Sequence, residues 1–174
     1  LGAGNQKETE ETIHSSFLIC LVTGLIICAV GLTSSRMFLA LLHTKDELME
    51  GAVNYLQIYS LGMPAMGLYN FGNGVMSARG DTKRPLVYLL IAGVLNVIMN
   101  LIFVIGFHMA AECVAIASVM AQYTSAGLVL HHLWRRRDVC RLQLRKVRFH
   151  RMAGKAVLML GIPGGLQQAI FAIA

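Results

Sequence analysis

The sequence predicts an all-α integral membrane protein, a polytopic bundle of about five membrane-spanning helices. Hydrophobic residues make up 56% of the 174 residues and charged residues 14%, and the mean hydropathy is +0.61, values far from those of soluble domains. Apolar runs long enough to cross a bilayer alternate with short polar stretches. The Lys and Arg residues behind the net charge of +6 fall in those polar stretches and form no continuous basic face, which argues against a nucleic-acid partner.

The first two predicted spans are separated by a polar turn at 45–50. The first span covers 13–33. The second covers 51–78 and contains so many glycines that neighbouring helices are expected to approach it closely. Within this second span, Pro64 is expected to bend or break the helix next to Gly62, because proline cannot donate a backbone hydrogen bond.

Three further spans are predicted at 86–108, 114–134 and 156–174. Between the last two, residues 135–155 are dominated by Arg and Lys and are expected to form an amphipathic connector at the membrane surface. Pro163 lies near the start of the last span and is a second candidate for a hinge or bend.

A charged hairpin is expected between the second and third spans. Gly80 can adopt a left-handed turn without steric cost. Asp81 and Thr82 can cap the helix that follows, and the fixed φ of Pro85 suits a first helical turn. Nothing in the hairpin is typical of a catalytic centre. The hairpin motif consists of Arg79, Gly80, Asp81, Lys83, Arg84 and Pro85.

The basic residues also predict the orientation of the chain. If 135–155 faces the cytoplasm, the hairpin and the amino end lie on the same side, and only Arg36 and Lys45 among the Lys and Arg residues fall on the other. Cytoplasmic segments of membrane proteins are enriched in Lys and Arg. We therefore expect a multi-pass protein of the plasma membrane whose amino end and connector are cytoplasmic.

The third span carries no charged side chain but contains Asn96 and Asn100, four residues apart and so on one helical face. Two amides in a membrane-length helix need protein, water or a ligand to satisfy them. Coordination of an ion or ligand is one interpretation, and hydrogen bonding that packs two helices together is the other. No Asp or Glu lies deep in any predicted span, and no catalytic or metal cluster is evident, so an enzyme is not expected.

Several short motifs occur in an order that one transporter family shares. They are Gly-Ala-Gly-Asn at 2–5, Tyr-Leu-Gln-Ile at 55–58, Gly-Met-Pro at 62–64, the hairpin with its flanks at 77–86, Asn96, and Ala-Ile-Ala-Ser-Val at 115–119 with Gln122. Together they resemble the multidrug and toxic compound extrusion (MATE) transporters, in particular the DNA-damage-inducible type and related bacterial members. The likeness covers essentially the whole chain.

The resemblance implies a twelve-helix fold of two six-helix lobes, of which this chain would be a fragment. Residues 1–134 would form most of the amino-terminal lobe, as its helices three to six. Residues 135–155 would be the linker between the lobes, and 156–174 the start of the carboxy-terminal lobe, a truncated helix seven.

The resemblance also implies a binding cavity in the amino-terminal lobe. The matching side chains are Tyr55, Asn73, Asn96 and Ser118. Asn100 stands where many members have Asp, so a titratable group of the family is missing at that position. The carboxylate of the family's first helix would lie upstream of Leu1.

The implied function is secondary-active export of organic cations or other amphipathic, drug-like compounds in exchange for protons or sodium, by alternating access. No cofactor besides the coupling ion is implied, and the full-length transporter is expected to be a monomer in the lipid bilayer. Two alternatives stay open. One is a lipid-linked oligosaccharide flippase of the same superfamily, which should show more cationic cavity residues. The other is a non-transporting membrane subunit that supports a partner through the basic linker.

Overall fold

The computed structural model describes residues 6–106, 111–136 and 150–173, and these ranges contain helices and no strand. The helices are α1 (Gln6–Leu41), α2 (Asp46–Ser60), α3 (Met63–Ser77), α4 (Lys83–Leu101), the π-helix η1 (Ile102–Gly106), α5 (Ala111–Arg135) and α6 (Arg151–Ile173). The predicted all-α fold class is confirmed. Most of the predicted amphipathic connector, 137–149, lies outside the described residues.

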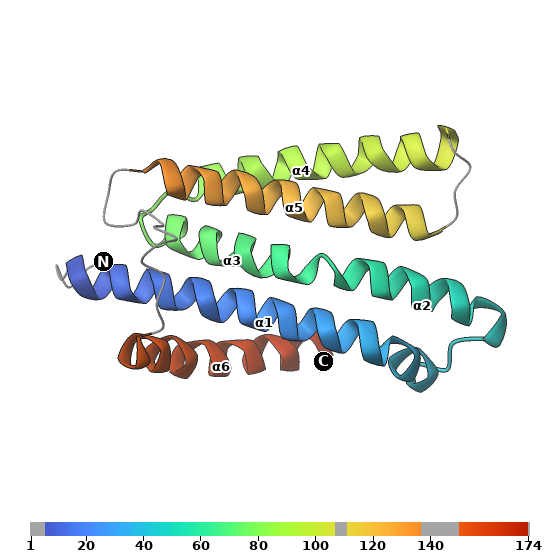
Figure 1. The fold of residues 1–174 in the computed structure, drawn as a ribbon, viewed down its shortest axis with the longest axis horizontal. Coiled ribbons are helices and arrows are strands. Elements are labelled where there is room, and N and C mark those ends of the chain that lie inside the picture. The colour runs from blue at the N-terminus through green and yellow to red at the C-terminus, as the bar shows by residue number, and fades with distance from the viewer. Residues whose placement is uncertain (1–5, 107–110, 137–149, 174) are drawn as a thin grey trace.

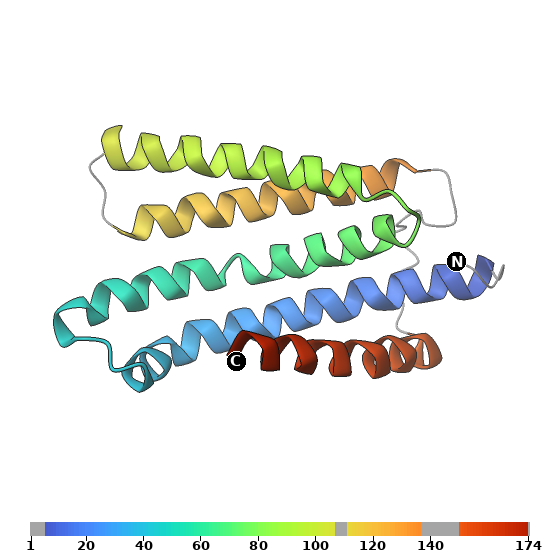
Figure 2. The same ribbon diagram turned by 180° about the vertical axis from the view of Figure 1, so that it is seen from behind.

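The helices lie side by side in the order α4, α5, α2 with α3, α1 and α6 (Figure 1). The reverse view shows the same order (Figure 2). α2 and α3 follow one another along one line, and each packs against α1 on one side and α5 on the other. This interrupted helix therefore occupies the centre of the bundle.

Three of the described helical stretches are long and apolar enough to cross a membrane: Glu8–Leu41, Lys83–Gly106 and Glu112–Arg135. They contain the predicted first and fourth spans and the predicted third span up to residue 106; its last two residues, 107–108, lie outside the described residues. Large apolar side chains on them are exposed, such as Leu90 at 67% and Met37 at 66%, which suits contact with lipid tails. The predicted second span corresponds to α2 and α3, each of 15 residues and so individually too short to cross.

The break between α2 and α3 lies where Pro64 interrupts the helical hydrogen bonds. Pro64 has no N–H to donate to the carbonyl of Ser60, four residues earlier, and α2 ends at Ser60. α3 begins at Met63 with Pro64 in its first turn, a position that tolerates proline. The bend or break expected at Gly62 and Pro64 is thus confirmed as a break. Pro163, by contrast, lies inside α6, and that helix continues through it.

The polar turn predicted at 45–50 is wrong for most of its length. α2 already begins at Asp46, and Asp46 and Glu47 occupy its first turn. Carboxylates are favourable there, because the backbone N–H groups give a helix N-terminus positive character. The turn itself is confined to 42–45, where His43 adopts a left-handed conformation with a φ of 56°.

Glycines let α1 and α3 meet backbone to backbone. A Cβ on Gly67 would lie 2.6 Å from the carbonyl oxygen of Cys20, and one on Gly24 would lie 2.7 Å from a backbone atom of α3. The close helix approach expected from the glycines of the second span is confirmed at this crossing. Beside it, the rings of Phe17 and Phe71 meet edge to face with centroids 5.5 Å apart, within the apolar core between α1, α3 and α5.

We expect Gly67→Ala to destabilise the full-length protein by about 1–3 kcal/mol, because the new methyl group meets the backbone of α1 and the helices must move apart. Gly74→Ala, also in α3, is the matched control, since a Cβ there has no atom within 4 Å and alanine favours helix. Thermal unfolding in detergent measures both. An unchanged midpoint for Gly67→Ala would contradict the close crossing.

Candidate functional site

Three polar side chains form a hydrogen-bonded row between α4 and α5, which we name the polar row: Asn96, Asn100 and Ser118. The Nδ2 of Asn100 donates to the Oδ1 of Asn96 at 3.0 Å, and the Nδ2 of Asn96 donates to the Oγ of Ser118 at 3.3 Å. Ser118 donates in turn to the carbonyl of Val114 at 2.9 Å. All three members of the row are half-buried. The predicted amide pair of the third span is therefore joined to α5.

Two buried amide oxygens have no hydrogen-bond partner among the described residues, the Oδ1 of Asn100 and the Oε1 of Gln122. Gln122 is not among the predicted cavity residues. The sequence could have indicated it, because it lies four residues from Ser118 and therefore on the same face of α5. A buried polar atom left without a partner costs about 1–3 kcal/mol. Amide oxygens bind water and hard cations. These two oxygens can therefore accept a hydrogen bond or coordinate a cation.

The polar row leads from one end of the bundle toward its middle. Because α4 and α5 are antiparallel, four side chains follow one another away from the end where α5 begins, in the order Asn100, Asn96, Ser118 and Gln122. At 1.5 Å per residue, Gln122 lies about 16 Å from the start of α5. There it packs so closely on Gly62 that no Cβ would fit at that glycine. Gln122 thus continues the line of the polar row to the break between α2 and α3.

The other two predicted cavity residues make contacts elsewhere. The ring of Tyr55 in α2 stacks on that of Tyr59, with centroids 6.1 Å apart. The Oδ1 of Asn73 in α3 accepts a hydrogen bond from the Oγ of Ser77 at 3.2 Å. Within the described residues, neither Tyr55 nor Asn73 is hydrogen-bonded to the polar row.

The hairpin between α3 and α4 turns on Gly80 as predicted, with a φ of 81°. The N–H of Gly80 donates to the carbonyl of Ser77 at 2.9 Å, and that of Asp81 to the carbonyl five residues earlier at 3.0 Å, a pairing that ends helices on a left-handed residue. The carboxylate of Asp81 accepts the N–H of Arg84 at 3.4 Å. Thr82 makes no side-chain capping bond, so that part of the capping prediction is wrong.

Asp81 also ties the hairpin to the end of α5. Its Oδ2 accepts hydrogen bonds from Arg84 at 3.0 Å and from Arg136 at 3.2 Å. The Nε of Arg136 donates to the Nε2 of His132 at 3.1 Å. Pro85 is buried in the first turn of α4, where the sequence predicts it. The charged hairpin therefore holds the start of α4 against the end of α5 through Asp81.

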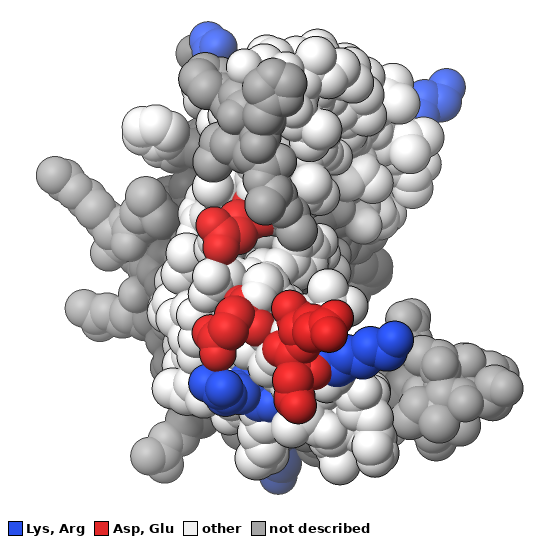
Figure 3. Space-filling model, turned by 90° about the vertical axis from the view of Figure 1, so that its right-hand side faces the viewer, with Lys and Arg blue, Asp and Glu red and all other residues white. Residues whose placement is uncertain are grey.

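The end of the bundle where α2 and α5 begin is rich in acidic side chains, as Figure 3 shows. The charged residues near this end in the described ranges are Asp46, Glu47, Glu50, Glu112, Arg36 and Lys45. The opposite end carries the basic residues of the hairpin and of the end of α5. Among the described Lys and Arg residues, Arg36 and Lys45 thus lie near one end, and those of the hairpin and of the end of α5 lie near the other. The orientation of the chain in the membrane stays a prediction.

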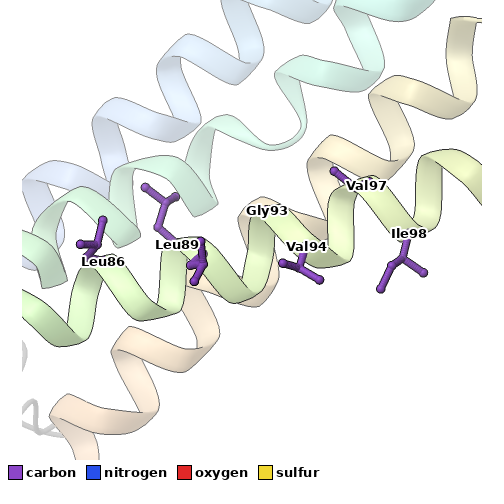
Figure 4. A pocket seen from close by; sticks show the side chains of 7 residues that line it. Leu86, Leu89, Gly93, Val94, Val97 and Ile98 are labelled. Carbon is purple, nitrogen blue, oxygen red and sulfur yellow. The ribbon is translucent and has the colours of Figure 1, made fainter.

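A shallow apolar groove of about 570 Å³ runs along an exposed face of α4. All the side chains that line it come from this one helix, between positions 86 and 98 (Figure 4). A ligand site needs a few polar groups to fix the orientation of its ligand, and Leu86, Leu90, Val94 and Ile98 offer none. Among the described residues, no three His, Cys, Asp or Glu side chains lie close enough together to hold a metal ion.

Comparison with known families identifies the family of the chain. The MatE family matches residues 1–102. The chain belongs to the MatE family. Among curated relatives of this MATE chain, the probable multidrug resistance protein YpnP of Bacillus subtilis is 32% identical over 154 residues, covering 87% of this chain and 34% of that protein. The DNA damage-inducible protein F of Escherichia coli is 27% identical over 128 residues, 71% of this chain and 27% of that protein. The chain spans about a third of the length of these relatives.

The fold agrees with this membership. The crystal structure of a MATE protein in the bent conformation matches with a TM-score of 0.83 and 19% identity, over 97% of this chain and 43% of that one. The predicted resemblance and the polytopic helical fold are therefore confirmed, and the family and its solved members are transporters rather than enzymes. The division of the chain at 134 and 155 into lobe, linker and second lobe stays a prediction.

We expect Asp81→Asn to lower the free energy of unfolding of the full-length MATE protein by about 1–2 kcal/mol, because two arginines lose a partly buried carboxylate. Glu50→Gln is the control. Its ion pair with Arg36 joins side chains that are 75% and 72% exposed, and such pairs contribute little. Equal thermal midpoints for the two variants would show that Asp81 does not stabilise the packing of the hairpin against the end of α5.

Proposed function

We propose that this chain is part of a secondary-active exporter that moves organic cations or other amphipathic compounds out of the cell in exchange for protons or sodium. The observation that carries the proposal is the polar row, set among apolar helices of membrane length, with the Oδ1 of Asn100 left without a partner among the described residues. Intramembrane polar groups of this kind line substrate and ion pathways. Membership of the MatE family and the multidrug resistance names of relatives support it.

In this exporter the polar row would hold the coupling ion. Its amide and hydroxyl oxygens can coordinate sodium or accept a hydrogen bond from a protonated group, but the row contains no carboxylate. An acidic group elsewhere in the full-length transporter would therefore supply the negative charge. Coupling requires only that the ion and the exported compound favour different states of the bundle. We expect the break at Gly62 and Pro64 to be the element that differs between these states.

We further propose that the transporter works as a monomer in the plasma membrane, with the hairpin and 135–155 in the cytoplasm. The distribution of Lys and Arg between the two ends of the bundle supports this orientation. The exported compound would then leave from the end where α2 and α5 begin, which is also the end from which the polar row leads inward.

Ethidium efflux from cells that express the full-length protein tests the exporter function. Efflux is measured with a proton gradient alone and then with a sodium gradient alone. We expect efflux to persist under one gradient and to collapse when that gradient is removed. Absence of efflux under both gradients, from well-expressed protein, would overturn drug export, and transfer of a lipid-linked oligosaccharide across vesicle membranes would then assign a flippase.

We expect Asn96→Ala to lower ethidium efflux roughly tenfold or more, equal to at least about 1.4 kcal/mol of the transport barrier. Asn96 is the central member of the row, and its loss removes two of the row's hydrogen bonds. Asn70→Ala is the control, because that amide is exposed on α3. Normal expression with reduced efflux is the expected result. Loss of the folded protein instead would favour a packing role for the row.

Asn100→Asp should make efflux depend on pH in a way that the wild type does not. A protonated carboxyl group can donate to the Oδ1 of Asn96, as the amide does at 3.0 Å, whereas an ionised one cannot. The ratio of variant to wild-type efflux should be near one at acid pH and should fall as pH rises through the pKa of the new carboxyl group. Asn70→Asp, with its exposed side chain, should give a flat ratio. A flat ratio for Asn100→Asp would mean that residue 100 need not donate.

A further inference from the structure

Two consecutive residues of α5 contact the break between α2 and α3. The hydroxyl of Tyr123 donates to the carbonyl of Leu61 at 3.1 Å. The amide of Gln122 lies against Gly62, where a Cβ would overlap its Oε1. Leu61 and Gly62 are the two residues that separate the helices. The break is therefore shaped from α5 as well as by Pro64.

The contact of Tyr123 has a plain structural reason. A helix interrupted at membrane depth leaves backbone carbonyls that need donors from neighbouring helices. The hydroxyl of Tyr123 supplies one to Leu61. This contact satisfies the backbone and by itself suggests no further role.

The contact of Gln122 is different, because it brings an acceptor to the break. Its Oε1 is buried and has no hydrogen-bond partner among the described residues. At the end of α2, the carbonyl of Ser60 has lost its helical donor, since Pro64 has no N–H. A buried acceptor oxygen without a partner is stabilised by any donor or cation that comes within its reach. The orientation of the Gln122 amide is therefore sensitive to any donor or cation within its reach.

Such a donor or cation would come from the polar row. Gln122 lies one helical turn from Ser118 on the same face of α5. Ser118 is hydrogen-bonded to Asn96, and Asn96 to Asn100. One side chain thus lies next to the row and also rests on the break.

We propose that Gln122 is a positioning residue that couples the polar row to the break. When an ion occupies the row, the Gln122 oxygen turns toward the ion and the amide loses its contact with Gly62. When the row is empty, the amide stays in contact with Gly62. The state of the row then sets the geometry of the α2–α3 junction. This inference rests on the exporter function proposed above.

Ethidium binding to the purified full-length protein tests the coupling. Its affinity is measured by fluorescence with and without the coupling ion, and the ratio of the two affinities is the readout. In the wild type this ratio should lie in the range of typical coupling, roughly 5- to 150-fold. A residue with only a packing role would change stability without changing this ratio.

Gln122→Met keeps the length of the side chain and removes its oxygen. We expect the ratio of the two affinities to fall below about twofold. Gln57→Met is the matched control, since the Nε2 of Gln57 in α2 donates to the carbonyl of Leu32 at 3.1 Å, outside the row. It should keep the wild-type ratio.

Gly62→Ala provides a second, independent variant, because its Cβ displaces the Gln122 amide. It should also lower the ratio, and combining it with Gln122→Met should lower the ratio no further, as expected for residues that act through one contact. Thermal midpoints establish which variants fold, and either variant alone suffices for the test.

A wild-type ratio in Gln122→Met or in Gly62→Ala would overturn the coupling role and leave the exporter function standing. A fall of the affinity ratio in Gln57→Met as well would also overturn the coupling role, since removal of any amide side chain would then lower the ratio. A wild-type protein that exports ethidium under neither gradient and shows no ion-dependent ethidium affinity would overturn the exporter function and the coupling together.

Discussion

Backbone polar groups at membrane depth must find partners inside the protein, and Pro64 removes one donor in the middle of the interrupted helix. This constraint explains why α2 and α3 lie at the centre of the bundle, between α1 and α5. On one side, the glycine crossing brings the backbone of α1 against α3 and excludes lipid. On the other side, Tyr123 donates to the carbonyl of Leu61. A break at an outer helix would have faced lipid tails that offer no hydrogen bonds.

The same constraint places the polar row. Amides that faced lipid would be unsatisfied, whereas Asn96 and Asn100 turn toward α5 and bond to each other and to Ser118. The exposed groove on another face of α4 is apolar, as a lipid-facing surface should be. α4 thus has an apolar face and a polar face. The polar face meets α5, the helix that also contacts the break.

Features set by local chemistry could be predicted from the sequence. The apolar runs, the left-handed Gly80 and the break at Pro64 depend on residues close together in the chain, and the structure has all of them. The prediction of a turn at 45–50 is wrong because acidic residues suit a helix N-terminus as well as a loop. Contacts between distant segments, such as Asp81 with Arg136 and Gln122 with Gly62, depend on the register of packed helices, which no local pattern contains.

The order of the helices limits how the polar row can influence the break. α5 lies between α4 and the interrupted helix (Figure 1), and it is continuous from Ala111 to Arg135. A continuous helix packed on both sides is costly to bend, because its backbone hydrogen bonds and its side-chain packing would both be disturbed. A side chain that changes rotamer leaves the backbone hydrogen bonds intact and disturbs the packing only locally. Gln122, one turn from Ser118 and in contact with Gly62, allows a small local rotation to act where the backbone is already interrupted.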